Sequence, residues 1–159
     1  MRDDRSEIWQ NVLFFITFIF GFIISWTILF APIHESGHVN AFKADGIMAT
    51  ILDWNHTATE KLTPHGMIAG FMSEFFFFIS IFIICFLISN PYKGGIRQFY
   101  FHLGFPFGYC NGIFFYALFS TDFIKMAGSG IVGAWCLFTL PFLIIGWIVL
   151  IITRLTTIK

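Results

Sequence analysis

Residues 12–38 read VLFFITFIFGFIISWTILFAPIHESGH, and this stretch decides the fold class. Its first 22 residues, 12–33, contain no charged side chain. About 20 apolar residues in a helix cross the hydrocarbon core of a bilayer, so the run predicts a membrane-spanning helix. Two histidines and a glutamate follow at once, and ionisable groups at the end of a spanning segment indicate a functional site.

The composition of the whole chain of 159 residues agrees with a membrane protein. Hydrophobic residues make up 57% and charged residues 11%, and the mean hydropathy is +0.81. These values exclude an ordinary soluble domain, which is about 25% charged, and a disordered chain. Nine basic residues balance nine acidic ones, which argues against a nucleic-acid partner. Cys85, Cys110 and Cys136 lie in apolar runs without a C-x-x-C pair, so no disulfide framework or thiolate zinc site is predicted.

Three further apolar segments follow the first. Backbone polar groups inside a bilayer need internal hydrogen bonds, so each segment is expected to be a helix. We expect the first helix to be retained, because its apolar core is too long for a signal peptide and lacks a small-residue cleavage site. The sequence therefore predicts an all-α, multi-pass integral membrane protein, a single domain over residues 1–159 with four transmembrane helices at about 12–40, 67–89, 99–122 and 131–152.

A polar stretch, residues 43–64, separates the first two apolar segments. Threonine and isoleucine residues surround Asp53-Trp54-Asn55-His56 within it. Such residues favour strands, so we expect a short β-hairpin lying at the membrane surface between the first two helices.

The H-E-S-G-H motif at residues 34–38 carries the chemistry. Residues four apart lie on one face of a helix, so His34 and His38 can bind one metal ion. Glu35 lies about 100° around the helix from His34 and can act without being a ligand. In a zinc peptidase the ion acidifies water, and such a glutamate accepts the proton and passes it to the leaving amine. The alternative is an interfacial helix end whose polar side chains merely face water.

Two small residues near the motif predict how this helix is packed. Pro32 removes a helical hydrogen bond and is expected to kink the chain one turn before the ligands. Gly37 allows another helix or a substrate backbone to approach closely. Ordinary packing would explain either residue equally well.

Two histidines leave a zinc ion short of at least one protein ligand. Asp122 closes the third apolar segment, 11 residues after Asn111, so the two share a face if the helix continues that far. The alternative is that Asp122 only marks the water boundary. Glu74, inside the second segment, could be protonated, pair with an imidazole, supply the third ligand, or extend to the interface. Further candidates are His102, which we expect to be structural, His65, Asp53 and His56.

The H-E-S-G-H motif with a later Asp122 resembles the site-2 protease family of intramembrane zinc metalloproteases. The resemblance implies that His34 and His38 bind zinc and that Glu35 is the catalytic residue. It also implies an Asn and Asp on a later helix, here Asn111 and Asp122, with Asp122 as the third zinc ligand. The resemblance covers about residues 12–125, and the stretch between the first two helices would correspond to surface strands that hold substrate by strand addition.

The chain departs from the family pattern at two places. Residues 69–74 are similar to a family segment that reads A-G-P-x-x-N, with Phe71 in place of proline and Glu74 in place of asparagine. The family's downstream motif, N-x-x-P-x-x-x-L-D-G, matches only in part. No proline lies between Asn111 and Asp122, and Phe123 follows the aspartate.

These observations lead to the expectation of a zinc endopeptidase that cleaves peptide bonds in or near transmembrane segments. The expected partners are the lipid bilayer, a transmembrane protein substrate and any regulatory membrane protein, because no sensing domain is visible. A first alternative is a catalytically inactive pseudoprotease or a subunit that binds a partner helix. A second is a membrane redox protein with haem or di-iron, although five scattered histidines do not supply the His boxes that di-iron enzymes need.

Overall fold

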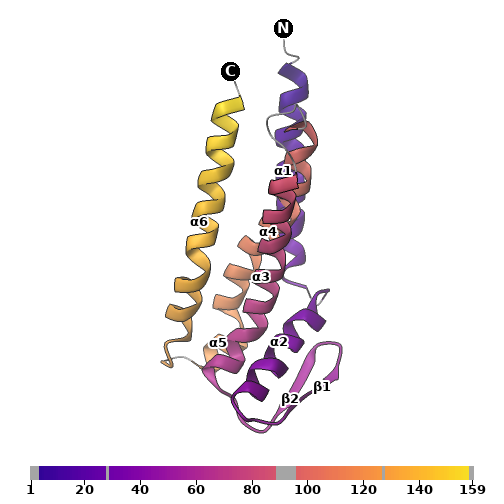
Figure 1. Ribbon diagram of the computed structural model, residues 1–159. Coiled ribbons are helices and arrows are strands. Elements are labelled where there is room, and N and C mark those ends of the chain that lie inside the picture. The colour runs from indigo at the N-terminus through magenta and orange to yellow at the C-terminus, as the bar shows by residue number, and fades with distance from the viewer. Residues whose placement is uncertain (1–3, 28, 89–95, 127, 158–159) are drawn as a thin grey trace.

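The computed structural model describes residues 4–27, 29–88, 96–126 and 128–157, and most of them are helical. The elements in chain order are α1 (Asp4–Ile24), α2 (Ala31–Ala44), β1 (Ala49–Asp53), β2 (His56–Thr59), α3 (Pro64–Ile88), α4 (Ile96–Phe119), α5 (Thr121–Lys125) and α6 (Ile131–Thr157). Figure 1 shows α1, α3, α4 and α6 along the length of the molecule, with α2, α5 and the hairpin gathered at one end. The predicted helical fold and the predicted hairpin are confirmed.

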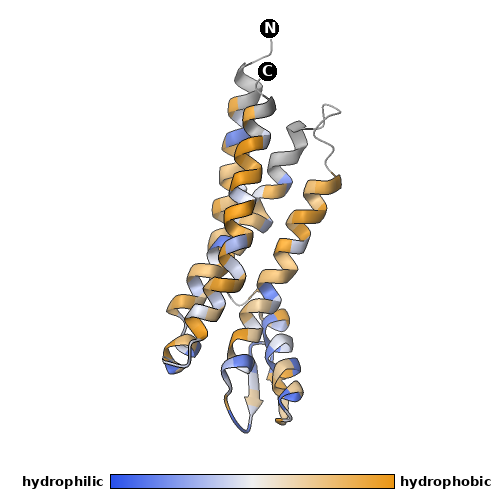
Figure 2. Cartoon of the chain, turned by 60° about the vertical axis from the view of Figure 1, so that its left-hand side comes forward, coloured by the Kyte–Doolittle hydropathy of each residue, from blue (hydrophilic) through white to orange (hydrophobic). Residues whose placement is uncertain are grey.

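Two helices are long and apolar enough to cross a membrane, namely α3 over Pro64–Ile88 and α6 over Ile131–Thr153. Of the four predicted spans, the second and the fourth are thus supported by helix length and composition. The apolar part of α1, Ile8–Ile24, is shorter, and α4 interrupts its apolar residues with glycines and polar side chains. Residue 89, the predicted end of the second span, lies outside the described residues. Figure 2 shows hydrophobic residues along the long helices and hydrophilic residues concentrated on α2 and the hairpin.

The first predicted helix, residues 12–40, is wrong as a single helix. It divides into α1 and α2, with turns between Ile24 and Ala31. The hydroxyls of Ser25 and Thr27 donate to carbonyls of the last turn of α1 and compete with its continuation. Pro32 then stands in the first turn of α2, where its missing N–H costs nothing. The predicted kink is therefore a complete break, and it lies before the motif.

The third predicted helix, residues 99–122, is wrong at its end. α4 stops at Phe119, and Ser120 adopts an extended conformation with φ −70° and ψ 150°. Its Oγ accepts a hydrogen bond from Phe123 N and so caps the short helix α5. Asn111 and Asp122 consequently belong to different helices, and the argument that placed them on one helical face does not hold.

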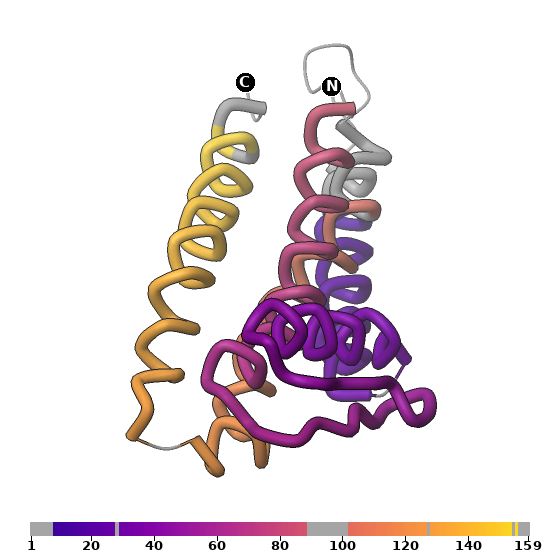
Figure 3. The backbone as a smooth tube through the Cα atoms, turned by 60° about the horizontal axis from the view of Figure 1, so that its bottom comes forward, coloured from indigo at the N-terminus to yellow at the C-terminus, as the bar shows by residue number. Residues whose placement is uncertain are grey.

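The hairpin pairs β1 and β2 in antiparallel fashion, with Ala49 opposite Thr59 and Ile51 opposite Thr57. The register shifts between Ile51 and Asp53, and Asp53 lies opposite His56 at the tip. Viewed from this end of the molecule, the hairpin runs beside α2 (Figure 3). It thereby covers the helix that carries the H-E-S-G-H motif.

A stripe of glycines holds α1 against α4. Gly104, Gly108 and Gly112 recur every four residues and so lie on one face of α4. A Cβ at any of the three would collide with the backbone or side chains of α1, such as Phe18, and one at Gly112 would also meet Ser25 just after α1. Small residues at such spacing let helix backbones approach closely inside membranes. The end of α1, and with it the start of α2, is thereby fixed relative to α4.

The remaining core is aromatic and joins α3 to α4 and α6. The rings of Phe78 and Tyr109 stack with centroids 3.8 Å apart. Trp135 of α6 is fully buried, and its indole N–H donates to the Phe114 carbonyl at 3.1 Å. Cys85, Cys110 and Cys136 are free, as the sequence predicted.

Candidate metal centre

The two motif histidines direct the same ring nitrogen toward one another from successive turns of α2. The Nε2 atoms of His34 and His38 are 2.9 Å apart. Two nitrogens that bind one zinc ion at about 2.05 Å in tetrahedral geometry are separated by about 3.3 Å. The rings therefore converge on a common point with nearly the spacing that a shared ion requires.

Gly70 of α3 provides room at this point. A Cβ at residue 70 would lie 2.6 Å from Nε2 of His38 and 2.7 Å from Nε2 of His34. A side chain of any size would thus occupy the space in front of both nitrogens. Gly37 of α2 makes the reciprocal approach, because a Cβ there would meet the Ala69 carbonyl and Ser73 of α3. The predicted close approach at Gly37 is one between two helices.

Asp122 supplies a third donor atom from α5. A ring nitrogen from each of His34 and His38 and one carboxylate oxygen of Asp122 all lie within 4.8 Å of one another. α5 is anchored by the buried Phe123, whose ring meets that of Phe71 edge-on with centroids 5.3 Å apart. The three ligands expected from the sequence are therefore together, although Asp122 arrives on a separate short helix.

The other ring nitrogen of His38 is also engaged. Its Nδ1 lies 2.6 Å from the carbonyl oxygen of Gly66, at the start of α3. An N–H donated to a backbone carbonyl fixes the tautomer and leaves Nε2 with its lone pair for a metal. Burial lowers the pKa of His38, and the neighbouring His34 lowers it further, while the Gly66 bond partly opposes both. The neutral imidazole that a metal needs is thereby favoured.

Glu74 of α3 faces His34 from the side away from this point. Its Oε2 lies 3.7 Å from Nδ1 of His34, and its side chain is only 5% exposed. The two nitrogens of an imidazole point in divergent directions, and here Nε2 faces His38. Glu74 thus lies within ion-pair distance behind the His34 ring, on the side from which carboxylates can orient metal-binding histidines, and it is not one of the three donors.

Glu35 is 7% exposed and is held by the hairpin. The hydroxyl of Thr57 in β2 donates to its Oε2 at 2.6 Å. Glu35 follows His34 on α2 and shares a cavity of about 350 Å³ with it. The cavity is lined by Ser25, Thr27, Ala31, His34, Glu35, Asn55, Phe71, Glu74, Tyr116, Phe119, Ser120, Thr121 and Asp122. The Glu35 carboxylate therefore shares one small, polar cavity with two of the three donors, His34 and Asp122.

Asn111, which the sequence placed beside Asp122, is engaged elsewhere. Its Nδ2 donates to the Phe107 carbonyl at 2.7 Å, and its Oδ1 accepts from the indole of Trp147 in α6 at 3.3 Å. These bonds join α4 to α6.

The remaining candidate ligands also lie outside the group of three donors. His65 contacts Asp45 with Nδ1 2.9 Å from Oδ1, and His56 contacts Asp53 at 2.8 Å in the same way. His102 is exposed in the first half of α4.

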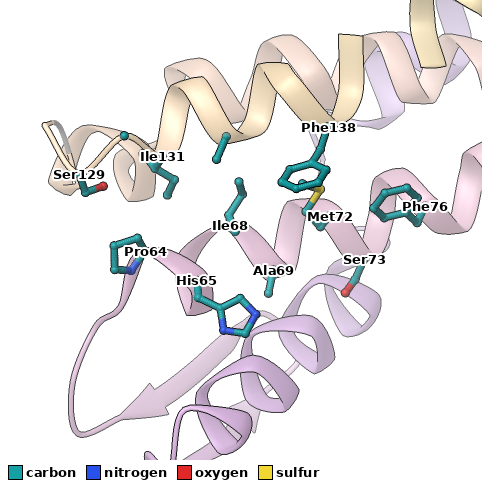
Figure 4. Close-up of a pocket in the computed structure, with 12 residues that line it drawn as sticks. Pro64, His65, Ile68, Ala69, Met72, Ser73, Phe76, Ser129, Ile131 and Phe138 are labelled. Atoms are coloured by element: carbon teal, nitrogen blue, oxygen red, sulfur yellow. The ribbon is translucent and has the colours of Figure 1, made fainter. Parts of the chain in front are cut away.

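A second cavity, of about 720 Å³, lies between the N-terminal halves of α3 and α6 (Figure 4). Apolar side chains such as Ile68, Met72 and Phe138 dominate its walls, and His65 is its one titratable lining residue. It offers no set of donors for a metal. The chemistry of the described residues therefore concentrates in the smaller cavity.

Four contributors to the site were missed by the sequence reasoning: the Gly66 carbonyl, Gly70, Thr57 and Ser120. Gly70 stands in the small-residue segment that resembles the family pattern, and this was the one signal for it. Ser120 precedes an acidic residue in the first turn of a helix, which is a usual pattern for a cap. Nothing in the sequence around Thr57 or Gly66 indicates a contact with the motif.

Comparisons with protein-family models, curated proteins and solved structures found no match to this chain.

Proposed function

We propose that this chain is a membrane-embedded zinc endopeptidase that hydrolyses peptide bonds in or near transmembrane segments. The observation that carries the proposal is the convergence of His34, His38 and Asp122 on a point beside the buried carboxylate of Glu35. Three protein ligands with one position left open are typical of catalytic zinc sites.

The residues around this common point suit a zinc ion in their charge, in the type of their ligand atoms and in the room that they leave for it. Two neutral imidazoles and one carboxylate are among the ligands that zinc prefers. Gly70 leaves room in front of the imidazoles. The Gly66 carbonyl and Glu74 stand behind His38 and His34, as orienting groups do at metal-binding histidines.

Each residue then has a defined part in the reaction. A zinc ion at this point would polarise the scissile carbonyl and acidify a water molecule. Glu35 accepts a proton from the attacking water and delivers it to the amine as the C–N bond breaks. A peptide bond within an intact helix is shielded from this attack. We therefore expect substrates whose transmembrane segment unwinds easily at helix-breaking residues.

We propose further that α1 and α4 are embedded in the bilayer together with α3 and α6, which makes the protein multi-pass. α1 exposes a series of large apolar side chains that lipid would cover: Phe15, Ile16, Ile19, Phe20 and Ile23. Extensive exposed apolar surface of this kind indicates contact with membrane or protein. The glycine stripe of α4 holds α1 so closely that the two helices enter the bilayer together.

The first test is the zinc content of the detergent-purified protein. We expect about one zinc ion per chain in the wild-type protein and in Glu35→Gln, and its loss from His34→Ala and His38→Ala. His102→Ala is the matched control, because residue 102 lies 17 positions before Phe119, where α4 ends near the site, or about 26 Å along the helix. A fluorogenic single-pass peptide with a Gly-Pro pair in its apolar segment should be cleaved by the wild-type protein and not by Glu35→Gln.

A well-folded protein that takes up no zinc, even after zinc is added back, would overturn the proposal. That result would favour the non-enzymatic alternative, a membrane protein that binds a partner helix. Zinc binding without cleavage of any transmembrane peptide would favour a pseudoprotease. Visible absorbance of the purified protein would instead indicate haem.

A further inference from the structure

The carboxylate of Glu35 is held by a residue that the H-E-S-G-H motif does not contain. Thr57 Oγ1 lies 2.6 Å from Oε2 of Glu35 and 3.5 Å from its backbone carbonyl oxygen. The shorter distance is that of a close hydrogen bond from a hydroxyl to a carboxyl oxygen. Among the residues that the structure describes, Thr57 is the hydrogen-bond donor to this side chain.

The tip of the hairpin fixes where Thr57 stands. Asp53 Oδ1 accepts from the backbone N–H of Asn55 at 3.1 Å and contacts Nδ1 of His56 at 2.8 Å. This side-chain turn determines where β2 begins, and Thr57 is its second residue. The position of the hydroxyl therefore depends on the hairpin and not on α2.

We infer that Thr57 is a positioning residue for the catalytic base, so that the hairpin completes the catalytic site. The inference rests on the proposed function, because Glu35 is a catalytic base only if the protein is a peptidase. With Oε2 held by Thr57, the carboxylate cannot rotate freely, and Oε1 is left to accept the proton. An oriented carboxylate speeds the reaction because the geometry for proton transfer is already formed when substrate binds.

Thr57→Val tests the inference, because valine has nearly the shape of threonine and lacks the hydroxyl. We expect kcat on the Gly-Pro transmembrane peptide to fall about ten-fold or more, with KM and zinc content unchanged. Thr57→Ser should restore most of the loss, since serine can donate the same bond. A merely structural contribution would not be rescued in this way.

Thr59→Val is the matched control on the same strand. The Thr59 hydroxyl donates to the Lys61 carbonyl at 3.0 Å and takes no part in the contact with Glu35. The Thr59→Val variant loses a hydroxyl from the same hairpin and should leave kcat within about two-fold of the wild-type value. A fall equal to that in Thr57→Val would overturn the inference by showing that any loosening of the hairpin slows the reaction.

A second readout is independent of peptide cleavage. Infrared spectra of protein with ¹³C-labelled glutamate report the carboxylate stretch of four residues, Glu7, Glu35, Glu60 and Glu74. We expect Thr57→Val to shift one of these bands, and Glu35→Gln to remove the same band. An unchanged band in folded Thr57→Val would overturn the inference even if the wild-type protein cleaved nothing. A shifted band with no cleavage by the wild-type protein would instead count against the proposed function alone.

Discussion

Oε2 of Glu74 lies 3.7 Å from Nδ1 of His34, behind the imidazole whose Nε2 faces His38. Glu74 is therefore a neighbour of the donor group without belonging to it, while Asp122 lies within the group. This relationship separates two carboxylates that the sequence could not distinguish. It also explains why a buried glutamate stands in an apolar helix, where an unpaired carboxylate would be costly.

The two carboxylates should differ in their effect on zinc affinity. Asp122→Ala removes a ligand and should abolish stable zinc binding. Glu74→Ala removes only the group that orients His34 and should weaken binding by about 10- to 100-fold. Zinc affinity measured by competition with a chelator compares the two variants. Asp53→Ala, at the exposed hairpin tip, is the control for loss of an aspartate, and zinc retained by Asp122→Ala but lost from Glu74→Ala would reverse the assignment.

Gly70→Ala should exclude the metal. The new methyl group would lie 2.6–2.7 Å from both Nε2 atoms, inside van der Waals contact and in the space where an ion would sit. We expect most of the bound zinc to be lost while the helical circular dichroism signal is retained. Gly133→Ala is the matched control, because a Cβ at that position meets nothing within 4 Å. Full zinc content in Gly70→Ala would place the metal elsewhere.

The sequence predicted those parts of the fold that depend on local pattern. Apolar runs of about 20 residues predicted the long helices, and the four-residue spacing of His34 and His38 predicted their shared face. The break between α1 and α2 was missed because Ser25 and Thr27 are only two hydroxyls in an apolar run, and their effect is local. A hydropathy pattern does not register such hydrogen bonds, although Pro32 marked the right region.

The sequence predicted the residues that could bind the metal, but not the groups that hold those residues in place. The expected shared face of Asn111 and Asp122 required α4 to continue to residue 122, whereas α4 ends at Phe119 and Asp122 lies beside the histidines on α5, which Ser120 caps. Thr57 and the Gly66 carbonyl act across distances of 22 and 28 residues in sequence. Contacts of this kind depend on how the elements pack. Every residue has a backbone carbonyl, so the residue type at position 66 does not indicate that its carbonyl accepts a hydrogen bond.

The acid stability of the protein should depend on Asp45, at the end of α2. Hydrogen bonds from His65 and then Thr63 lower the pKa of Asp45 below its ordinary value of 3.8. Since the carboxyl is more acidic in the folded chain than in the unfolded one, its ionised form stabilises the fold above about pH 3.8. This contribution is lost as the pH falls through the lowered value.

Asp45→Asn should therefore lower Tm at pH 7, and the difference from wild type should shrink as the pH falls below 3.8 and through the lowered pKa of Asp45. Thermal unfolding in detergent at several pH values measures this. Glu60→Gln, an exposed acidic residue in the loop after β2, is the control for loss of a negative charge. A difference in Tm that persists unchanged at pH 2 would show that the contacts of Asp45 do not require its charge.

Ser120→Ala should affect both stability and zinc binding, because this serine caps the helix that carries Asp122. Loss of a cap costs about 1 kcal/mol, and Phe123 N would lose the acceptor that begins α5. We expect a lower Tm together with weaker zinc affinity, since the Asp122 carboxylate is no longer held near His34 and His38. Ser80→Ala is the control for loss of a serine hydroxyl, because the Ser80 hydroxyl donates to the Phe76 carbonyl within α3 and does not cap a helix. If Ser120→Ala lowered Tm and left zinc affinity unchanged, Asp122 would reach the metal without the help of the cap, and α5 would serve packing through Phe123 alone.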